Sequence, residues 1–435
     1  MIDRKVSREA ASASVPETLF SLESRAREKL GVLEGIQEFF WATEPTRSRL
    51  ALILAEIEGR STVDDWRRAV KQIRQRYPLL CAGIRKSPGE RPYLESLPDT
   101  DIPLRVVPYE EGVSVDALMA RELANSFGRG EGPLARVALH HSSDRTIIIL
   151  VVHHAAYDGL TNVNIVHDLI AAAAGEAVGE ALPVLPTTGE LLGLPAPSSY
   201  TERLSDSAAV RCPRLDLPTL KVTSGRIEAD RVRVLLERAR KENTSVHGVL
   251  VATAILAAKR QSNAWQTQPL ICLSPVDLRP MLNLDNAAGV LTTIHPTIVM
   301  PTDAPDFWDF ARAVTRSIRT TISVDTARRG VIATRAVVDR ETDPYDLSTV
   351  DRDGFFNHDM MITNYGVGKV RSQYGHLELI ALYPSHFSGS APQTQTLSAI
   401  TVNGALHLNH ASRQPLPSFL DIVLEGLGQV CSPST

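Results

Sequence analysis

Apolar and polar residues alternate with a helical period between residues 61 and 77. One apolar stripe is formed by Val63, Trp66, Val70 and Ile73. Thr62 and Asp65 have the spacing of a capping box at the start of this segment, and Pro78 follows its end. The pattern predicts an amphipathic helix over residues 61–77.

The tetrapeptide SSDR separates two apolar segments, residues 134–141 and 146–152. The second segment reads TIIILVV, which is rich in β-branched residues and typical of a buried strand. Together the segments predict a hairpin. The strand is followed by HHAAYDG, and beyond Gly159 apolar residues return with helical spacing. We therefore expect the order strand, polar loop, helix.

Regular patterning is lost between residues 181 and 223, where prolines stand at positions 183, 186, 195, 197, 213 and 218. This segment is the best candidate for a linker. The expected division is an N-terminal lobe at 1–180, a proline-rich linker at 181–223 and a C-terminal lobe at 224–435.

The second half begins with a charged segment of helical pattern over residues 229–242. Thr244 and Ser245 then have the character of helix caps before the apolar run VHGVLVATAILAA. Such a helix is expected to be buried on most sides. The run LICLS from Leu270 predicts a strand, and it leads into PVDLRP. Prolines on both sides of this motif are expected to stop regular pairing.

Length and charge narrow the classes of protein that this chain can represent. A length of 435 residues exceeds what one core usually supports, so two domains of about 200 residues are expected. A formal charge of −4 provides no overall positive field, which argues against nucleic acid as a partner. One basic stretch has two interpretations, the solvated face of a helix or a docking surface. It consists of Arg67, Arg68, Lys71, Arg74 and Arg76.

The four cysteines lack CxxC spacing, which favours reduced thiols over a zinc knuckle or a disulfide framework. They are Cys81, Cys212, Cys272 and Cys431. The first twenty residues lack the apolar core of a signal peptide, and the longest apolar runs fall short of the ~18 residues of a membrane span. We expect a soluble, cytoplasmic protein without a membrane span.

Two imidazoles and a carboxylate directly follow the predicted buried strand, at His153, His154 and Asp158. Histidine suits proton abstraction from an alcohol or amine, because an unperturbed pKa of about 6.5 keeps the neutral base abundant. The alternatives are a buried structural pair and a metal site. Adjacent histidines on extended backbone point to opposite sides, and no second ligand cluster is evident, so we expect no metal. The histidines without motif context are expected to be structural, including His247, His295, His358, His386 and His410.

HHAAYDG resembles the HHxxxDG signature of the thioester-dependent acyltransferase superfamily. That superfamily includes nonribosomal peptide condensation domains, plant acyltransferases and phthiocerol dimycocerosyl transferase-like enzymes. TSVHGVLVATAILAA, PVDLR and NLDNAAG are similar in order and spacing to the last group, and the resemblance covers residues from about 30 to 430. The DFGWG segment of the plant enzymes is missing, and its nearest counterpart is Thr363-Asn364-Tyr365-Gly366. Asn364 is the candidate oxyanion donor or substrate contact, and the alternative is an ordinary turn that it makes with Gly366.

The resemblance implies a role for each residue of the motif. His154, the second histidine, would be the base or proton relay, whereas His153 and Asp158 would act at the catalytic site mainly as structural groups. Asp158 would pair with Arg279 of the VDLR segment, and breaking such a buried ion pair costs roughly 3–5 kcal/mol. Gly159 would allow close approach of the donor's pantetheine arm.

The same resemblance implies mixed α/β architecture in two lobes related to chloramphenicol acetyltransferase, with an active-site tunnel between them. It implies a standalone condensation-type acyltransferase that moves an acyl group from a carrier-protein or coenzyme A thioester to an alcohol or amine. Polyketide, nonribosomal peptide or lipid biosynthesis would be its setting, and an acyl or peptidyl carrier protein its partner. No bound cofactor or metal is expected.

Two alternatives remain open at this point. One is a non-catalytic condensation-like module that binds a carrier protein or a partner enzyme. An intact HHAAYDG counts against it, because binding alone needs no base. The other is an epimerase-type relative that shares the motif.

Overall fold

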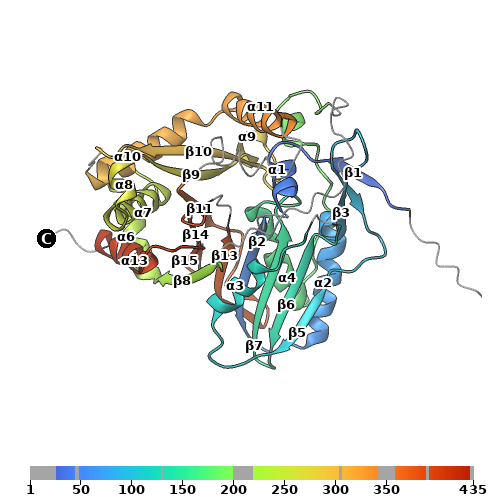
Figure 1. The fold of residues 1–435 in the computed structure, drawn as a ribbon. Coiled ribbons are helices and arrows are strands. Elements are labelled where there is room, and N and C mark those ends of the chain that lie inside the picture. Colours follow the sequence, from blue (N-terminus) through green and yellow to red (C-terminus); the bar gives the residue numbers. More distant parts are fainter. Residues whose placement is uncertain are drawn as a thin grey trace, which may run out of the picture.

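The computed structural model describes residues 26–44, 49–128, 131–198, 219–302, 306–340, 358–387 and 391–431. Two six-stranded sheets and one three-stranded sheet organise these residues. Each large sheet and its helices form one lobe, and the two lobes lie side by side (Figure 1). The expectation of two mixed α/β lobes is thereby confirmed.

The N-terminal sheet has the order β12-β13-β2-β7-β6-β5. Its strands are β12 (Gln373–Tyr374), β13 (Leu377–His386), β2 (Leu50–Glu58), β7 (Arg145–His153), β6 (Ala135–His141) and β5 (Leu104–Pro108). Helices α2 (Val63–Arg76) and α4 (Gly159–Ala173) pack on one face, and α3 (Val115–Ala124) packs on the other. Because both faces of β7 are covered, its apolar run is continuous. Ile148 and Leu150 belong to one core, and Ile147 and Ile149 belong to the other.

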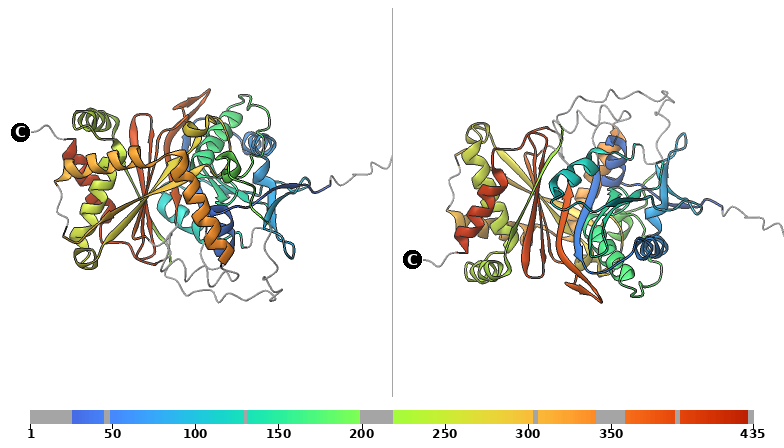
Figure 2. Two further views of the ribbon diagram at one scale, coloured as in Figure 1. Left: turned by 90° about the horizontal axis from the view of Figure 1, so that it is seen from above. Right: turned by 90° about the horizontal axis from the view of Figure 1, so that it is seen from below.

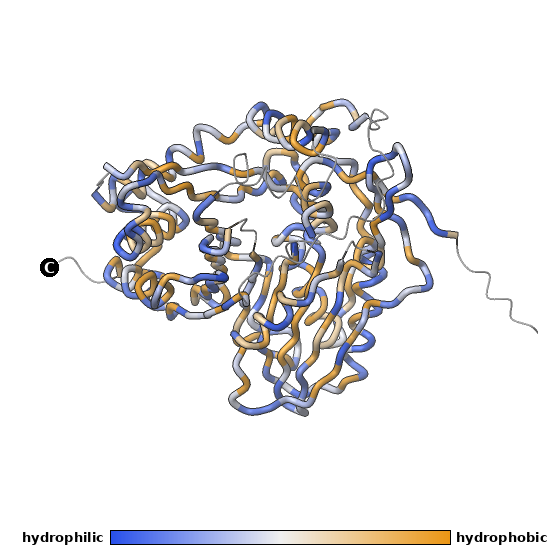
Figure 3. The backbone as a smooth tube through the Cα atoms, viewed as in Figure 1, coloured by the Kyte–Doolittle hydropathy of each residue, from blue (hydrophilic) through white to orange (hydrophobic). Residues whose placement is uncertain are grey.

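The hairpin and the capped helix that the sequence predicts in the N-terminal lobe are both present. β6 and β7 pair antiparallel as a hairpin, and the apolar residues of both strands show as hydrophobic stretches between hydrophilic outer turns (Figure 3). Thr62 and Asp65 form both hydrogen bonds of a capping box at the start of α2. The small sheet β1-β4-β3 adjoins this lobe, and the segment that leads into it contains a 3-10 helix. These elements are β1 (Lys29–Val32), β4 (Tyr93–Ser96), η1 (Pro78–Cys81) and β3 (Ala82–Arg85).

The C-terminal sheet has the order β10-β9-β11-β14-β15-β8. Its strands are β10 (Thr292–Val299), β9 (Leu270–Asp277), β11 (Met360–Val367), β14 (Gln395–Val402), β15 (Ala405–Ser412) and β8 (Lys221–Ile227). Its helices are α6 (Ala229–Lys241), α7 (Val246–Gln261), α8 (Ala264–Thr267), α10 (Phe307–Thr321) and α13 (Phe419–Val430). Helix α7 packs against α10, α13 and the sheet, which explains why it is apolar nearly all round.

The two lobes are not two uninterrupted stretches of chain. Strand β13 comes from the C-terminal half, yet it pairs along its length with β2 of the N-terminal sheet. Figure 2 shows this strand in orange beside the blue strand β2. A boundary between 1–180 and 224–435 therefore misassigns β12 and β13, because a strand contributed from a distant part of the chain leaves no signal in the local pattern.

Strand β9 continues through the first proline of PVDLRP, which differs from the expectation. Pro275 lies opposite Ile294 in an antiparallel ladder that extends to Asp277. On its other side β9 pairs with β11 only at Cys272 and Leu273. Pro275 therefore lies where β9 has one neighbour, so a residue without an N–H is tolerated. The helix α9 (Arg279–Leu282) begins directly afterwards.

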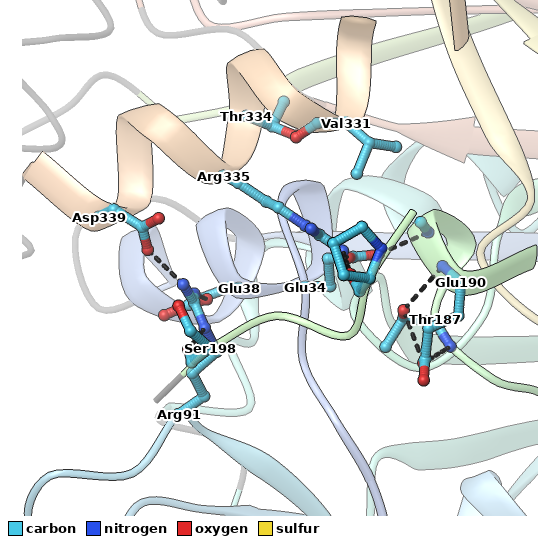
Figure 4. A network of polar contacts seen from close by, with 12 residues as sticks. Glu34, Glu38, Arg91, Thr187, Glu190, Ser198, Val331, Thr334, Arg335 and Asp339 are labelled. Atoms are coloured by element: carbon cyan, nitrogen blue, oxygen red, sulfur yellow. Dashed lines mark hydrogen bonds and ion pairs between the residues drawn. The ribbon is translucent and has the colours of Figure 1, made fainter. Parts of the chain in front are cut away.

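Part of the expected linker is ordered and packs between the two halves of the chain. Residues 221–223 belong to β8, residues 199–218 lie outside the described residues, and α5 (Thr188–Leu191) interrupts the proline-rich stretch. Around α5, Glu34 and Arg91 of the N-terminal half contact α11 (Val324–Arg340) of the C-terminal half (Figure 4). Glu34 accepts from Arg335 Nε (2.7 Å), and Arg91 joins Glu38 of α1 (Ile36–Thr43) to Asp339.

Cys81, Cys272 and Cys431 are free and buried, and Cys212 lies outside the described residues. Across the described ranges, no helix has the length and apolar character that a membrane crossing requires.

Candidate active site

HHAAYDG forms the connection between the end of β7 and the start of α4. His153 is the last residue of β7, and Asp158 is the N-cap of α4. The peptide between them is held on both sides. His154 N donates to Arg49 O (2.9 Å), and Gln37 Nε2 donates to Ala155 O (2.9 Å). The loop therefore has a defined geometry at the junction of the lobes.

The two histidines point in different directions, as extended backbone requires. His153 is fully buried, and its Nδ1 accepts from Ala155 N (3.1 Å). Burial, and then the neighbouring His154, lower the pKa of His153 to about 3. His153 is therefore neutral near pH 7 and shapes the turn. His154 instead lines a cavity of about 230 Å³ between the two lobes.

The cavity walls come from both halves of the chain. Helix α1 provides Ile36, Phe39 and Phe40, and the β9–β10 ribbon with the segment before β10 provides Pro275, Asp277, Val290, Thr292 and Ile294. Strand β11 adds Met361, Thr363, Asn364 and Tyr365, whereas Arg49, His154, Asp158, Gly159, Leu160, Arg279, His358 and His386 complete the lining. The lining therefore combines apolar side chains, such as those of α1, with polar ones near His154.

His154 stays neutral because it is buried in this cavity. Burial lowers its pKa below the ordinary value, which keeps the imidazole a free base near pH 7. Phe40 covers one side at 4.6 Å between ring centroids, and His386 stands edge-on at 6.2 Å. The Nδ1 atom is buried and interacts with the backbone of His154 itself, so Nε2 is the ring nitrogen that a substrate can reach.

Asp158 and Arg279 form a buried ion pair, as the family resemblance implied. Arg279 Nη1 lies 3.0 Å from Asp158 Oδ2, and Nη2 donates to Oδ1 at 3.0 Å. Asp158 also accepts from Thr161 N (2.8 Å) and Leu291 N (2.9 Å). Burial by itself would raise the pKa of Asp158, but Arg279 and these donors hold it below its ordinary value. The carboxylate is therefore charged near pH 7, and both of its oxygens are engaged in contacts with the protein.

Arg279 connects the motif to the C-terminal half through further bonds. It donates to Asp277 Oδ1 (2.8 Å), Ala287 O (2.9 Å) and Thr161 Oγ1 (2.8 Å). The NLDNAAG segment approaches from the same side, since Asp158 N donates to Gly289 O (3.1 Å). The loop that carries His154 is thereby anchored to both lobes.

The structure brings Asn364 and Gly159 to the cavity, each in a specific setting. Asn364 Oδ1 accepts from Gly366 N (3.0 Å), which fixes its amide in a turn. The adjacent Thr363 hydroxyl is buried without a partner and lines the cavity. Beside Gly159, where the resemblance placed a pantetheine arm, the ring of Tyr365 fills the space.

Sequence reasoning missed several residues that line the site. His358 and His386 were expected to be structural, yet both line the cavity, because the residues just before β11 and the end of β13 bring them there from far along the chain. The α1 residues Phe39 and Phe40 carried no motif. By contrast, His247 bonds to Ser274 (2.8 Å) outside the cavity. Among the residues that the structure describes, no group of three His, Cys, Asp or Glu side chains is placed to hold a metal.

Solved structures with the same fold show to which fold class this chain belongs. Polyketide synthase associated protein 5 from Mycobacterium tuberculosis matches with a TM-score of 0.67 and 16% identity, over 94% of this chain and 99% of that one. The condensation domain of the monacolin K polyketide synthase MokA matches at 0.64 and 12%, over 94% and 97%. TRI101 of F. graminearum, complexed with ethyl coenzyme A, matches at 0.61 and 12%, over 93% and 97%. The chain has the fold of condensation domains and related acyltransferases.

Within that class, residues 218–409 match the family described as the phthiocerol/phthiodiolone dimycocerosyl transferase C-terminus. No match was found among curated protein sequences. The C-terminal family match and the shared fold confirm the superfamily resemblance that was based on the sequence.

Proposed function

We propose that this protein is a standalone condensation-type acyltransferase that uses an acyl thioester as donor and an alcohol or amine as acceptor. The observation that carries the proposal is the placement of His154. A neutral, half-buried imidazole faces a cavity between two lobes and stands on a loop fixed by the Asp158–Arg279 pair. General-base assistance to an incoming hydroxyl or amine is the chemistry that this arrangement favours.

The reaction needs one proton relay. His154 Nε2 takes the proton from the acceptor as its oxygen or nitrogen attacks the thioester carbonyl carbon. The carbonyl oxygen becomes an oxyanion, for which the Thr363 hydroxyl and the Asn364 amide are the candidate donors. When the C–S bond breaks, the proton passes from His154 to the leaving thiolate. The products are an ester or amide and a free thiol.

Asp158 is a positioning residue in this mechanism. Both of its oxygens accept hydrogen bonds or ion-pair contacts from the protein, and its side chain makes no hydrogen bond to His154 within the described residues. Its charge is balanced by Arg279, so it fixes the loop rather than taking part in proton transfer. His153 acts on the loop in the same way.

The donor is proposed to be an acyl group on the phosphopantetheine arm of an acyl or peptidyl carrier protein, or on coenzyme A. TRI101, which shares the fold, was solved with ethyl coenzyme A. Fewer basic side chains of α2 are available to a carrier protein than the composition of the helix indicates. Arg76 pairs with Asp168 (2.7 Å), and Arg74 donates to Thr100 O (3.0 Å). Arg67, Arg68 and Lys71 are exposed on that face, although Arg67 pairs with Asp64 (2.8 Å) and Arg68 pairs with Asp65. Polyketide, nonribosomal peptide or lipid biosynthesis is the proposed setting, and the cytoplasm the proposed location.

The experiment measures product formation by mass from purified protein, a panel of acyl thioesters and a panel of alcohols and amines. His154→Ala should lower single-turnover transfer by about 10²–10⁴-fold, because it removes the general base. His167→Ala is the matched control, since His167 is a partly buried histidine that bonds to Tyr374 (2.8 Å) outside the cavity. It should keep wild-type rates. Near-wild-type transfer by a folded His154→Ala protein would contradict the mechanism.

The non-catalytic alternative makes a different prediction in the same assay. A module that only binds a carrier protein would retain carrier affinity in His154→Ala and would show no transfer with any donor in either form. His154-dependent turnover with any thioester excludes it. The neutral and accessible His154 favours the enzyme, because a binding module has no use for a positioned base.

A further inference from the structure

His386 is a second histidine beside the proposed base His154, and the reaction described above gives it no role. It is the last residue of β13 and is buried. Its ring stands edge-on to the ring of His154, with 6.2 Å between the two centroids, and both residues line the cavity. A second polar ring therefore adjoins the base within the same cavity.

The two ring nitrogens of His386 have different neighbours. Nδ1 lies 3.4 Å from the hydroxyl oxygen of Ser398, which is buried. Nε2 lies 3.3 Å from Sδ of Met361, and Met361 lines the cavity. Nε2 is therefore the nitrogen on the cavity side of the ring.

These neighbours determine which nitrogen carries the proton. Burial lowers the pKa of His386 to about 3, so the ring is neutral near pH 7 and has one N–H group. The thioether sulfur of Met361 can accept a hydrogen bond but cannot donate one, whereas the hydroxyl of Ser398 can do both. Both contacts have a donor only when Nε2 carries the proton, because Ser398 then donates to Nδ1.

The Nε2–H group of His386 is a donor that a substrate can use. A thioether is a weak acceptor, and a buried donor is stabilised when it gains a stronger one. Two imidazoles that hydrogen-bond one shared atom, each at about 2.9 Å, have ring centroids roughly 6–8 Å apart. The separation of 6.2 Å lies at the lower end of that range, where the angle at the shared atom is close to tetrahedral. One atom of the acceptor can therefore contact both His154 and His386.

The atom that gives its proton to His154 is the nucleophile of the acceptor. An alcohol oxygen has one proton and two lone pairs, so it can donate to His154, accept from His386 and keep one lone pair for the attack. An amine nitrogen has a single lone pair. A nitrogen that accepts from His386 cannot attack, and a nitrogen that attacks leaves the Nε2–H group of His386 without a new acceptor.

We propose, on the basis of the proposed function, that His386 is a specificity-determining residue that hydrogen-bonds the attacking oxygen of the acceptor and favours a hydroxyl over an amine. As His154 removes the proton, the oxygen gains negative charge, which the N–H group of His386 stabilises. The C–O bond then forms, the C–S bond breaks, and the proton passes from His154 to the leaving thiolate. His386 keeps its own proton throughout.

The test measures kcat/KM for an alcohol and for the amine with the same carbon skeleton, using one acyl thioester at one pH. The ratio of the alcohol value to the amine value in wild-type protein is the reference. His386→Leu removes the donor and should lower this ratio by about 5–100-fold, because the loss falls on the alcohol. His386→Gln keeps an amide N–H near the position of Nε2 and should retain most of the wild-type ratio.

His410→Leu is the matched control. His410 is another buried histidine on a strand, β15, and its Nε2 bonds to Gln395 (2.9 Å) away from the residues that line the cavity. Its substitution should leave the ratio unchanged. Each ratio is measured within one variant, so partial unfolding of that variant does not affect it.

Three results would each overturn the role of His386. The first is an equal loss for alcohol and amine in His386→Leu, which an oxyanion donor or a purely structural residue would produce. The second is a ratio in His386→Gln as low as in His386→Leu, and the third is a wild-type protein that uses amines but no alcohol. Absence of any His154-dependent transfer in wild-type protein would instead refute the proposed function, and the inference with it.

Discussion

Removal of the Asp158–Arg279 ion pair is the perturbation that most directly tests how the motif loop is held. Arg279→Ala leaves the Asp158 carboxylate buried without its cation, and Asp158→Ala leaves a buried guanidinium. The second loss is softened, because Arg279 keeps Asp277 at 2.8 Å. We therefore expect the electrostatic part of the loss in stability to be larger for Arg279→Ala. Asp158→Ala carries a second cost, because it also removes the N-cap of α4.

The magnitudes follow from these contacts. Breaking a buried pair on one side costs roughly 3–5 kcal/mol, and loss of an N-cap costs about 1 kcal/mol. In the double variant no buried charge of this pair remains, so the total loss should fall short of the sum by about 1–3 kcal/mol. His154→Ala breaks no ion pair and should be the mildest of the variants.

Urea unfolding of the wild type, both single variants and the double variant completes the cycle. Lys29 and Glu90 form a matched control pair at 3.2 Å with both side chains about half exposed, so its coupling should be small. Strictly additive losses for Asp158 and Arg279, or a coupling no larger than that of the control pair, would show that the buried pair does not stabilise the loop.

Three further predictions concern the pH dependence of activity, the pH dependence of stability, and the donor. Burial lowers the pKa of His154, so its neutral form persists below pH 6.5. The value of kcat/KM should therefore stay constant as the pH falls through 6.5 and should decrease only at lower pH. A decrease of kcat/KM that begins above pH 6.5 would contradict a buried base. Burial lowers the pKa of His153 and of His386 to about 3 in the folded protein, whereas an unfolded histidine has a pKa of about 6.5. The free energy of unfolding should therefore be highest above pH 6.5 and should decrease as the pH falls below that value. Urea unfolding at a series of pH values measures this decrease. An acyl group on a carrier protein should be a better donor than the same group on coenzyme A, with a stronger salt dependence of kcat/KM. Charge reversal at Arg67 and Arg68 should remove that difference, and equal kcat/KM values for both donors at low salt would leave coenzyme A as the natural donor.

Local patterns predicted the elements that carry the motif because those patterns are short-range. The capping box at Thr62, the hairpin before His153 and the helix after Gly159 all depend on residues within a few positions of one another. Pro275 was misjudged, because whether a proline disrupts a strand depends on which neighbours the strand has at that point. Pairing with a distant strand is not encoded in the residues beside the proline.

The sequence by itself determined the motif and the strand and helix on either side of it, and its family resemblance implied the pairing of Asp158 with Arg279. The tertiary structure decided what surrounds His154. Strand β13 crosses into the N-terminal sheet and brings His386 to the cavity, and a bulge in β11 turns Tyr365 against Gly159. These contacts join residues more than 200 positions apart, so they depend on sheet order and register. A local pattern of apolar and polar residues contains neither, because many partners satisfy the same alternation.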